Sequence, residues 1–152
     1  MVRNPYDAVR DLVSEAQFSA NVAATVEAWG GLLDEDAAGL LVAAQLGRDI
    51  VAYGRVAELQ EGLEATLKVV VDEVVPVREF ARQDGTRGRV ANLLVHDDSG
   101  KCLVVLWDDD VEIPAKLGLR PGSALRVVDG FVRRTNFGLE VGRGRFGRLL
   151  PG

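Results

Sequence analysis

The first 47 residues carry apolar side chains at helical spacing, interrupted by residues that begin and end helices. Asn4 followed by Pro5 is typical of a helix start, with Asn as the N-cap and Pro in the first turn. Ser19 and Asp34 are the predicted N-caps of a second and a third helix, and Gly47 is the predicted end of the third. The pattern therefore predicts a small bundle of three short helices. Val9, Leu12 and Val13 recur at helical spacing in the first helix, and Val22, Val26 and Trp29 share one face of the second. In the third helix the predicted inward positions are Leu40, Leu41 and Ala44.

From residue 63 onward, apolar and polar positions alternate and β-branched residues become frequent. This pattern predicts antiparallel strands, and Pro76 inside the first of them predicts a bulge or a sheet edge. A short helical turn is predicted near Ile113 to Leu117, between the third and fourth strands. Five antiparallel strands with an insertion at this point follow the order of an OB fold, a small and partly open β-barrel. The predicted strand segments are 63–81, 89–97, 101–107, 123–134 and 139–150.

The two regions also differ in charge. Residues 1–62 hold four arginines against ten carboxylates, a net charge of −6, whereas residues 63–152 hold fourteen Lys and Arg against thirteen carboxylates, a net charge of +1. We therefore predict an α+β chain in sequence order, with a helical bundle over 1–47, a linker over 48–62 and an OB-fold domain over 63–152. The carboxylates of the bundle form either an ordinary solvated surface or an acidic dock for a basic replication or repair protein.

The sequence holds one cysteine and one histidine, and this excludes most catalytic and metal chemistry. An internal disulfide cannot form, and Cys102 with His96 cannot make a zinc site. We expect no cofactor and no enzymatic activity. The chain has no apolar run near the ~20 residues that a membrane span needs, and it begins without the apolar segment of a signal peptide. A cytoplasmic location without membrane contact is therefore expected.

Trp107 occupies the last position of the third predicted strand, directly before three aspartates. Alternation places Cys102, Val104 and Leu106 on one face and Trp107 on the other. If the wholly apolar set fills the interior, the Trp107 ring points outward. The alternative is that Trp107 closes one end of the barrel as a plug. Asn92 and Lys101 fall on the same predicted outer face as Trp107.

Arginines gather in the segments predicted to surround Trp107, and Phe137 lies at the tip of the last predicted hairpin. Aromatic rings stack on bases at ~1–3 kcal/mol each, and cations follow the phosphates, so this combination favours single-strand binding. Phe137 could instead fold back onto its hairpin, and the arginines could form a solvated face of mixed charge. The run Asp108, Asp109 and Asp110 is expected to be a loop. Two alternatives are that it restricts where phosphates enter and that it holds a hard cation. The arginines are Arg82, Arg87, Arg89, Arg133, Arg134, Arg143 and Arg145.

Residues 63–149 resemble an OB fold of the archaeal replication protein A family of single-stranded DNA-binding proteins. The resemblance runs through "VREFARQDGTRGRVANLLVHDDSGKCLVVLWDDD" and "LGLRPGSALRVVDGFVRRTNFGLEVGRGRFGRL", and "DDSGK" followed by "VVLWDD" is its most specific part. The same residues also resemble the second DNA-binding domain of the large subunit of eukaryotic replication protein A. The resemblance implies that Trp107 and Phe137 stack on bases. The helical segment containing "WGGLLDEDAAGLLVAAQLG" is similar to the region that precedes such domains in some archaeal members.

These observations together predict a non-enzymatic protein that binds single-stranded DNA with little sequence preference, in replication, repair or recombination. Such a protein would be associated with the nucleoid. Two alternatives stay open: an OB-fold module that binds other replication or repair proteins, and an OB fold that binds RNA. The predicted nucleic-acid contacts are Trp107, Phe137, Arg82, Arg87, Arg89, Asn92, Lys101, Arg133, Arg134, Arg143 and Arg145.

Overall fold

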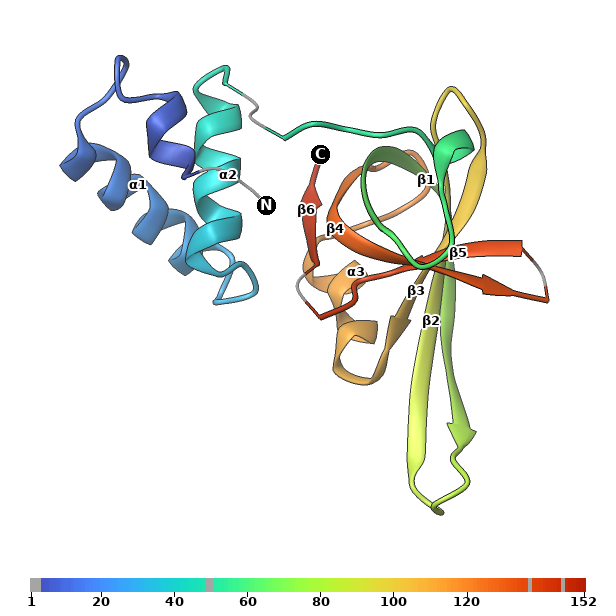
Figure 1. The fold of residues 1–152 in the computed structure, drawn as a ribbon. Coiled ribbons are helices and arrows are strands. Elements are labelled where there is room, and N and C mark those ends of the chain that lie inside the picture. Colours follow the sequence, from blue (N-terminus) through green and yellow to red (C-terminus); the bar gives the residue numbers. More distant parts are fainter. Residues whose placement is uncertain (1–3, 49–50, 137, 146) are drawn as a thin grey trace. The chain divides into compact units, whose positions relative to one another are not determined.

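The computed structural model describes residues 4–48, 51–136, 138–145 and 147–152 (Figure 1). The chain divides into two compact units, Met1–Ala52 and Tyr53–Gly152. Within the described residues, no helix is long and apolar enough to cross a membrane.

The first unit is helical, but its first element is shorter than the sequence predicts. A 3₁₀ turn, η1 (Pro5–Ala8), is followed by the helices α1 (Glu15–Ala28) and α2 (Glu35–Gln45). Asn4 and Asp34 cap η1 and α2, as predicted, by accepting hydrogen bonds from the backbone N–H groups of Tyr6 and Ala37. These caps satisfy donors that have no partner inside the helix.

The predicted cap at Ser19 is wrong, because Ser19 lies inside α1. The cap is Ser14, whose hydroxyl accepts a hydrogen bond of 3.1 Å from the backbone N–H of Gln17. Ser14 is followed by the helix formers Glu-Ala-Gln, so the helix begins five residues earlier than predicted. The buried cluster of this unit forms around Phe18, while Trp29 is the half-buried C-cap of α1.

The second unit is a six-stranded sheet in the order β1-β2-β3-β5-β4-β6, and an additional β1–β4 pairing makes a closed circuit of five strands (Figure 1). Most neighbours are antiparallel, but β3 and β5 are parallel. The prediction of five antiparallel strands is therefore wrong in strand number and in one pairing. The strands are β1 (Glu64–Ala81), β2 (Arg87–His96), β3 (Lys101–Trp107), β4 (Ala124–Thr135), β5 (Gly138–Gly142) and β6 (Arg148–Pro151).

The predicted fifth strand is divided into β5 and β6. Gly144 has a φ of +66°, a left-handed conformation that turns the chain between them. After this turn, β6 pairs with the first half of β4, whereas β5 pairs with the second half. The single strand β4 thus pairs with two short strands in succession. The alternation of apolar and polar residues does not reveal this division.

The insertion between β3 and β4 contains η3 (Asp108–Glu112) and α3 (Ile113–Lys116), close to the predicted helical turn. β1 and β2 form a long hairpin that extends away from the rest of the second unit (Figure 1). The register of this hairpin shifts between Val75 and Arg78, so the bulge predicted at Pro76 is present.

Alternation along β3 separates the two faces of the sheet as predicted. Cys102, Val104 and Leu106 are buried, whereas Lys101 and Trp107 are exposed. Val105 is an exception, because it shares the face of Trp107 but is buried. The interior is wholly apolar, and burial of this surface is the main source of stability for such a fold. Its fully buried large side chains include Leu67, Leu93, Leu106, Leu125 and Leu150.

Residues 54–63, which we call the strap, belong to the second unit and contain the single turn η2 (Val56–Glu58). The backbone N–H of Gly54 donates to the Thr66 carbonyl, and that of Gly62 donates to the Val132 carbonyl of β4. The carboxylate of Asp97, just after β2, accepts from the Val56 N–H. Much of the segment that the sequence analysis assigned to a linker is thus hydrogen-bonded to the sheet.

Candidate nucleic-acid interface

Trp107 ends β3 with 41 % of its surface exposed. The Phe80 ring of β1 meets it edge to face, with ring centroids 5.7 Å apart and an angle of 83° between the planes. Such an edge contact holds the indole in place without covering both of its faces. The plug alternative is therefore wrong, because a plug would be buried.

A second layer supports Phe80. The guanidinium carbon of Arg82 lies 5.2 Å from the centroid of the Phe80 ring, a cation–π arrangement. Across the hairpin, Phe80 pairs with Gly88, and a Cβ at Gly88 would overlap the Phe80 ring and lie 2.7 Å from Nη2 of Arg82. Gly88 thus leaves the space in which Phe80 and Arg82 stack beside Trp107.

The three aspartates after Trp107 each bind one arginine. Asp108 binds Nη2 of Arg82 with both oxygens, at 2.7 Å each. The hydrogen bond from Arg82, and next that from the Arg89 backbone N–H, hold the pKa of the Asp108 carboxyl below its usual value. Asp108 itself has a φ of +51°, a conformation that Asp tolerates better than most residues.

The other two aspartates continue this arrangement. Asp109 lies 3.6 Å from Nη2 of Arg89, and Oδ2 of Asp110 accepts a 2.9 Å hydrogen bond from Nε of Arg143. We call Asp108–Asp110 the acidic turn. It forms the start of η3 rather than an irregular loop. Among the residues that the structure describes, no group of three or more His, Cys, Asp or Glu is arranged to hold a metal ion, so the cation expectation gains no support.

A pocket of about 510 Å³ opens beside Trp107 and contains a second exposed ring, Phe131 of β4. Phe131 is 40 % exposed, and its cross-strand neighbour is Gly142, which has no side chain to cover it. A Cβ at Gly144 would lie 3.1 Å from the Phe131 Cβ, so a second glycine also leaves room at this ring. The pocket is lined by Val105, Trp107, Asp110, Phe131, Arg133, Gly142, Arg143 and Gly144.

Sequence reasoning missed Phe131 as a site residue. The signal was present, because alternation places Phe131 on the same face of β4 as Arg133. Phe80 was missed as well. Its contact with Trp107 depends on the register of β1 against β2, and the sequence of β1 alone does not reveal that register.

The remaining predicted residues are distributed more widely. Lys101 lies at the opposite end of β3 from Trp107, about 20 Å away at ~3.3 Å per residue. Asn92 pairs with Val105 and is half-buried, and its Oδ1 has no hydrogen-bond partner in the described part of the chain. Arg87 and Arg134 bind Glu79 and Glu61, at 3.2 and 3.1 Å.

For two of the predicted contact residues, Arg145 and Phe137, the structure says little about a role in the site. Arg145 is exposed and follows Gly144 at the edge of the pocket region. Phe137 lies outside the described residues, so its stacking role stays a prediction.

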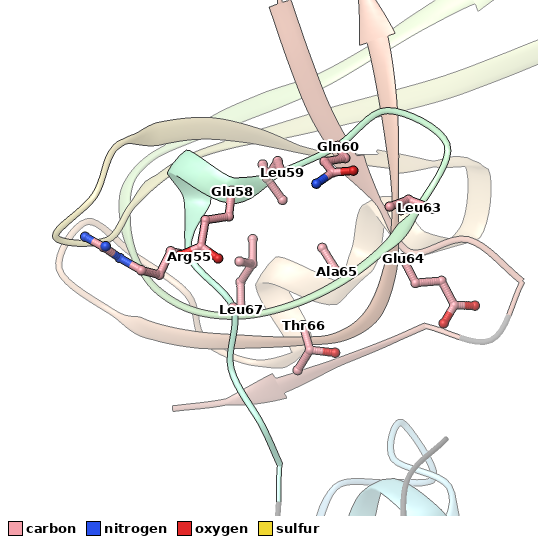
Figure 2. A pocket seen from close by; sticks show the side chains of 10 residues that line it. Arg55, Glu58, Leu59, Gln60, Leu63, Glu64, Ala65, Thr66 and Leu67 are labelled. Carbon is pink, nitrogen blue, oxygen red and sulfur yellow. The ribbon is translucent and has the colours of Figure 1, made fainter.

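A second pocket, of about 200 Å³, lies between the strap and the start of β1 (Figure 2). Leu59, Ala65 and Leu67 contribute apolar surface, and its charged residues are Arg55, Glu58 and Glu64. With two carboxylates against one guanidinium and no aromatic ring, this pocket is poorly suited to a nucleotide. The pocket of Trp107 and Phe131 is therefore the better candidate.

Known proteins with similar sequence or fold include OB-fold domains of replication protein A. The chain is 23 % identical over 147 residues to "Replication factor A" of Methanothermobacter thermautotrophicus, a match that covers 87 % of this chain and 18 % of the relative. The second OB-fold domain of replication protein A from Methanococcus maripaludis is 28 % identical, with a TM-score of 0.51 over 60 % of this chain and 88 % of that domain. The second unit is thus similar to the OB-fold domains of archaeal replication protein A.

The fold also matches a replication protein A heterotrimer bound to single-stranded DNA. The TM-score is 0.57 at 16 % identity, over 65 % of this chain and 24 % of that one, so this match supports the OB fold alone. No family model matches the chain.

Proposed function

We propose that the chain binds single-stranded DNA without base-specific recognition, through the OB fold of its second unit. The observation that carries this proposal is the pair of exposed rings, Trp107 and Phe131, in one pocket with Arg133 and Arg143. Apolar surface that gathers in one exposed place often marks a binding site, and unpaired bases stack on aromatic rings.

Base stacking requires rings that are open on a face and held in orientation. The Phe80 edge contact holds Trp107 from the side, and Gly142, across the strand from Phe131, has no side chain to cover that ring. Stacking tolerates any base, because every base has a π-face. The proposal therefore includes little sequence preference. A stacking role for Phe137, carried over from the resemblance, is part of the proposal as well.

Arginines at the rim supply the attraction to phosphates. Arg82, Arg89 and Arg143 surround Trp107 through their carboxylate partners, and Arg133 lines the pocket. Binding that depends on phosphate contacts weakens as salt rises, since counterions released from the strand drive part of it. The name of the relative, "Replication factor A", supports a place in DNA replication. Repair and recombination, and a role as a binding protein rather than an enzyme, are part of the proposal.

Fluorescence titration of the full chain with oligo-dT tests the proposal. A Trp29→Phe background leaves Trp107 as the one tryptophan, whose emission can be excited apart from that of the tyrosines, because the sequence holds two tryptophans. Quenching on addition of oligo-dT is expected. Replacing Trp107 by Ala should lower the affinity about 5- to 150-fold, as measured by anisotropy of a labelled strand, if one stacked base contributes ~1–3 kcal/mol. Phe131→Ala should weaken binding in the same way, while Phe131→Tyr, which keeps the ring, should not.

An unchanged affinity in Trp107→Ala would refute the stacking role. Competition between oligo-dT and oligo-U separates DNA from RNA binding, since both backbones can present bases to the same rings. Retention of a replication or repair protein without binding to either oligonucleotide would instead support the protein-interaction alternative. The acidic residues of the first unit are the surface proposed for such a partner.

A further inference from the structure

The arginines around Trp107 are occupied before any ligand arrives. Arg82, Arg89 and Arg143 each donate to, or lie against, one carboxylate of the acidic turn. A carboxylate uses the same planar fork of guanidinium donors that a phosphate uses. A DNA phosphate that binds one of these arginines must therefore replace or share its carboxylate partner.

We propose that the acidic turn Asp108–Asp110 is an intramolecular competitor of the nucleic-acid backbone, which keeps phosphate binding weak unless bases also stack on the rings. This inference rests on the proposed function and concerns the regulation of the same site. DNA binds by exchanging carboxylate for phosphate on the arginines.

The exposure of these ion pairs suits an exchange. The side chains of Asp108, Asp109 and Asp110 are 53 %, 104 % and 26 % exposed. Ion pairs at exposed positions contribute little to stability, because water and salt screen them. The carboxylates of Asp108 and Asp109 can therefore move away from their arginines at low cost, whereas Asp110 is partly buried.

The position of Asp110 makes the competition direct. Asp110 lines the same pocket as Trp107, Phe131 and Arg133, so a phosphate beside a stacked base meets a like charge there. Repulsion of this kind reduces the attraction to any polyanion, but it leaves the stacking surface of the rings unchanged. Duplex DNA offers phosphates with its bases already stacked, so the acidic turn favours single strands over duplexes.

Asparagine variants of the full chain test the inference. Asp108→Asn, Asp109→Asn and Asp110→Asn each remove one negative charge, and Asn accepts the left-handed φ of residue 108. The matched control is Asp98→Asn, which makes the same change of charge at the β2–β3 turn, at the opposite end of β3 from Trp107. The length of β3 thus separates Asp98 from the acidic turn by more than the ~10 Å over which charges act at ~0.1 M salt.

We expect each variant of the acidic turn to bind oligo-dT about fivefold more tightly at low salt, the effect of one unit charge ~4 Å from a phosphate in water. The gain should be larger for a duplex of equal length and should vanish in high salt. Asp98→Asn should match the parent chain in every assay. Anisotropy of labelled strands gives the affinities, and thermal melts show that each variant is folded.

Weaker oligo-dT binding in the variants would overturn the inference, because it would mean that the carboxylates position the arginines for DNA. An effect equal to that of Asp98→Asn would overturn it as well. Asp109→Asn keeps the test decisive if another variant fails to fold, since its side chain is fully exposed. A parent chain that does not bind oligo-dT refutes the proposed function itself, which is a separate outcome.

Discussion

Asp97 joins the strap to the sheet, and its replacement by Ala should destabilise the second unit. Oδ2 accepts a hydrogen bond of 2.9 Å from the Val56 backbone N–H in the strap. Oδ1 accepts from the backbone N–H groups of Ser99 and Gly100, at 2.8 and 3.1 Å, and from the Ser99 hydroxyl at 2.5 Å. One carboxylate thus organises the β2–β3 turn and holds the strap against it.

The size of the effect follows from these four contacts. A hydrogen bond to a charged group contributes ~1.5–3 kcal/mol, and a neutral one about half of that. In Asp97→Ala, water can reach the half-exposed turn donors of Ser99 and Gly100, whereas Val56 is buried and its N–H loses its partner. We therefore expect the free energy of unfolding to fall by about 2–4 kcal/mol, well below the sum of the single bonds.

The same contacts give this stability a pH dependence. Burial raises the pKa of the Asp97 carboxyl, but hydrogen bonds from Ser99 and from the Val56 and Gly100 N–H groups outweigh it and lower the pKa. A folded-state pKa below the unfolded value of ~3.9 favours the ionised, folded form. The contribution of Asp97 is therefore present above pH ~4 and is lost as the pH falls through the folded pKa.

Urea unfolding followed by circular dichroism, at pH 7 and at stepwise lower pH, measures both effects. Asp98→Ala is the control, because Asp98 is the next residue, is 88 % exposed and, among the described residues, pairs with Arg55 alone, at 3.9 Å. It should cost less than ~1 kcal/mol. The difference between the parent chain and Asp97→Ala should shrink below pH 4. Equal losses in the two variants at pH 7 would refute the reasoning.

Three further predictions follow from single contacts. Phe80→Ala removes the edge contact that orients Trp107, worth ~0.5–1.5 kcal/mol, so oligo-dT affinity should fall about two- to tenfold in an anisotropy titration. Gly130→Ala places a Cβ 2.8 Å from two valine side chains of the core and should cost ~1–3 kcal/mol in a urea titration, and an unchanged midpoint would contradict this packing. Burial raises the pKa of Cys102 to about 11, so a thiol reagent at pH 8 should react rapidly only after urea is added.

Several features of the chain follow from short stretches of sequence. Asn4 and Asp34 are caps because a side-chain oxygen reaches a backbone N–H only two or three residues away. Pro76 lacks an N–H for the sheet ladder, so a bulge at this position was predictable. The outward position of Trp107 follows from alternation along one strand, since successive side chains of a strand point to opposite faces.

Local signals also compete with one another along the chain. Ser14 and Ser19 are both acceptable caps, and the run of helix formers after Ser14 decides between them. Likewise the segment 139–150 has the composition of one strand, and a turn with Gly144 in the left-handed conformation divides it.

Tertiary structure alone decided what surrounds Trp107. Its neighbours come from β1, from β4 and from the segment after β5, far apart in the chain, and strand register brings them together. The pairing of the acidic turn with Arg82, Arg89 and Arg143 arises in the same way, over separations that no local pattern encodes. Alternation and capping depend on neighbouring residues and are therefore determined by the sequence directly. The composition of a pocket depends on which strands lie side by side, and that is settled only when the whole sheet forms.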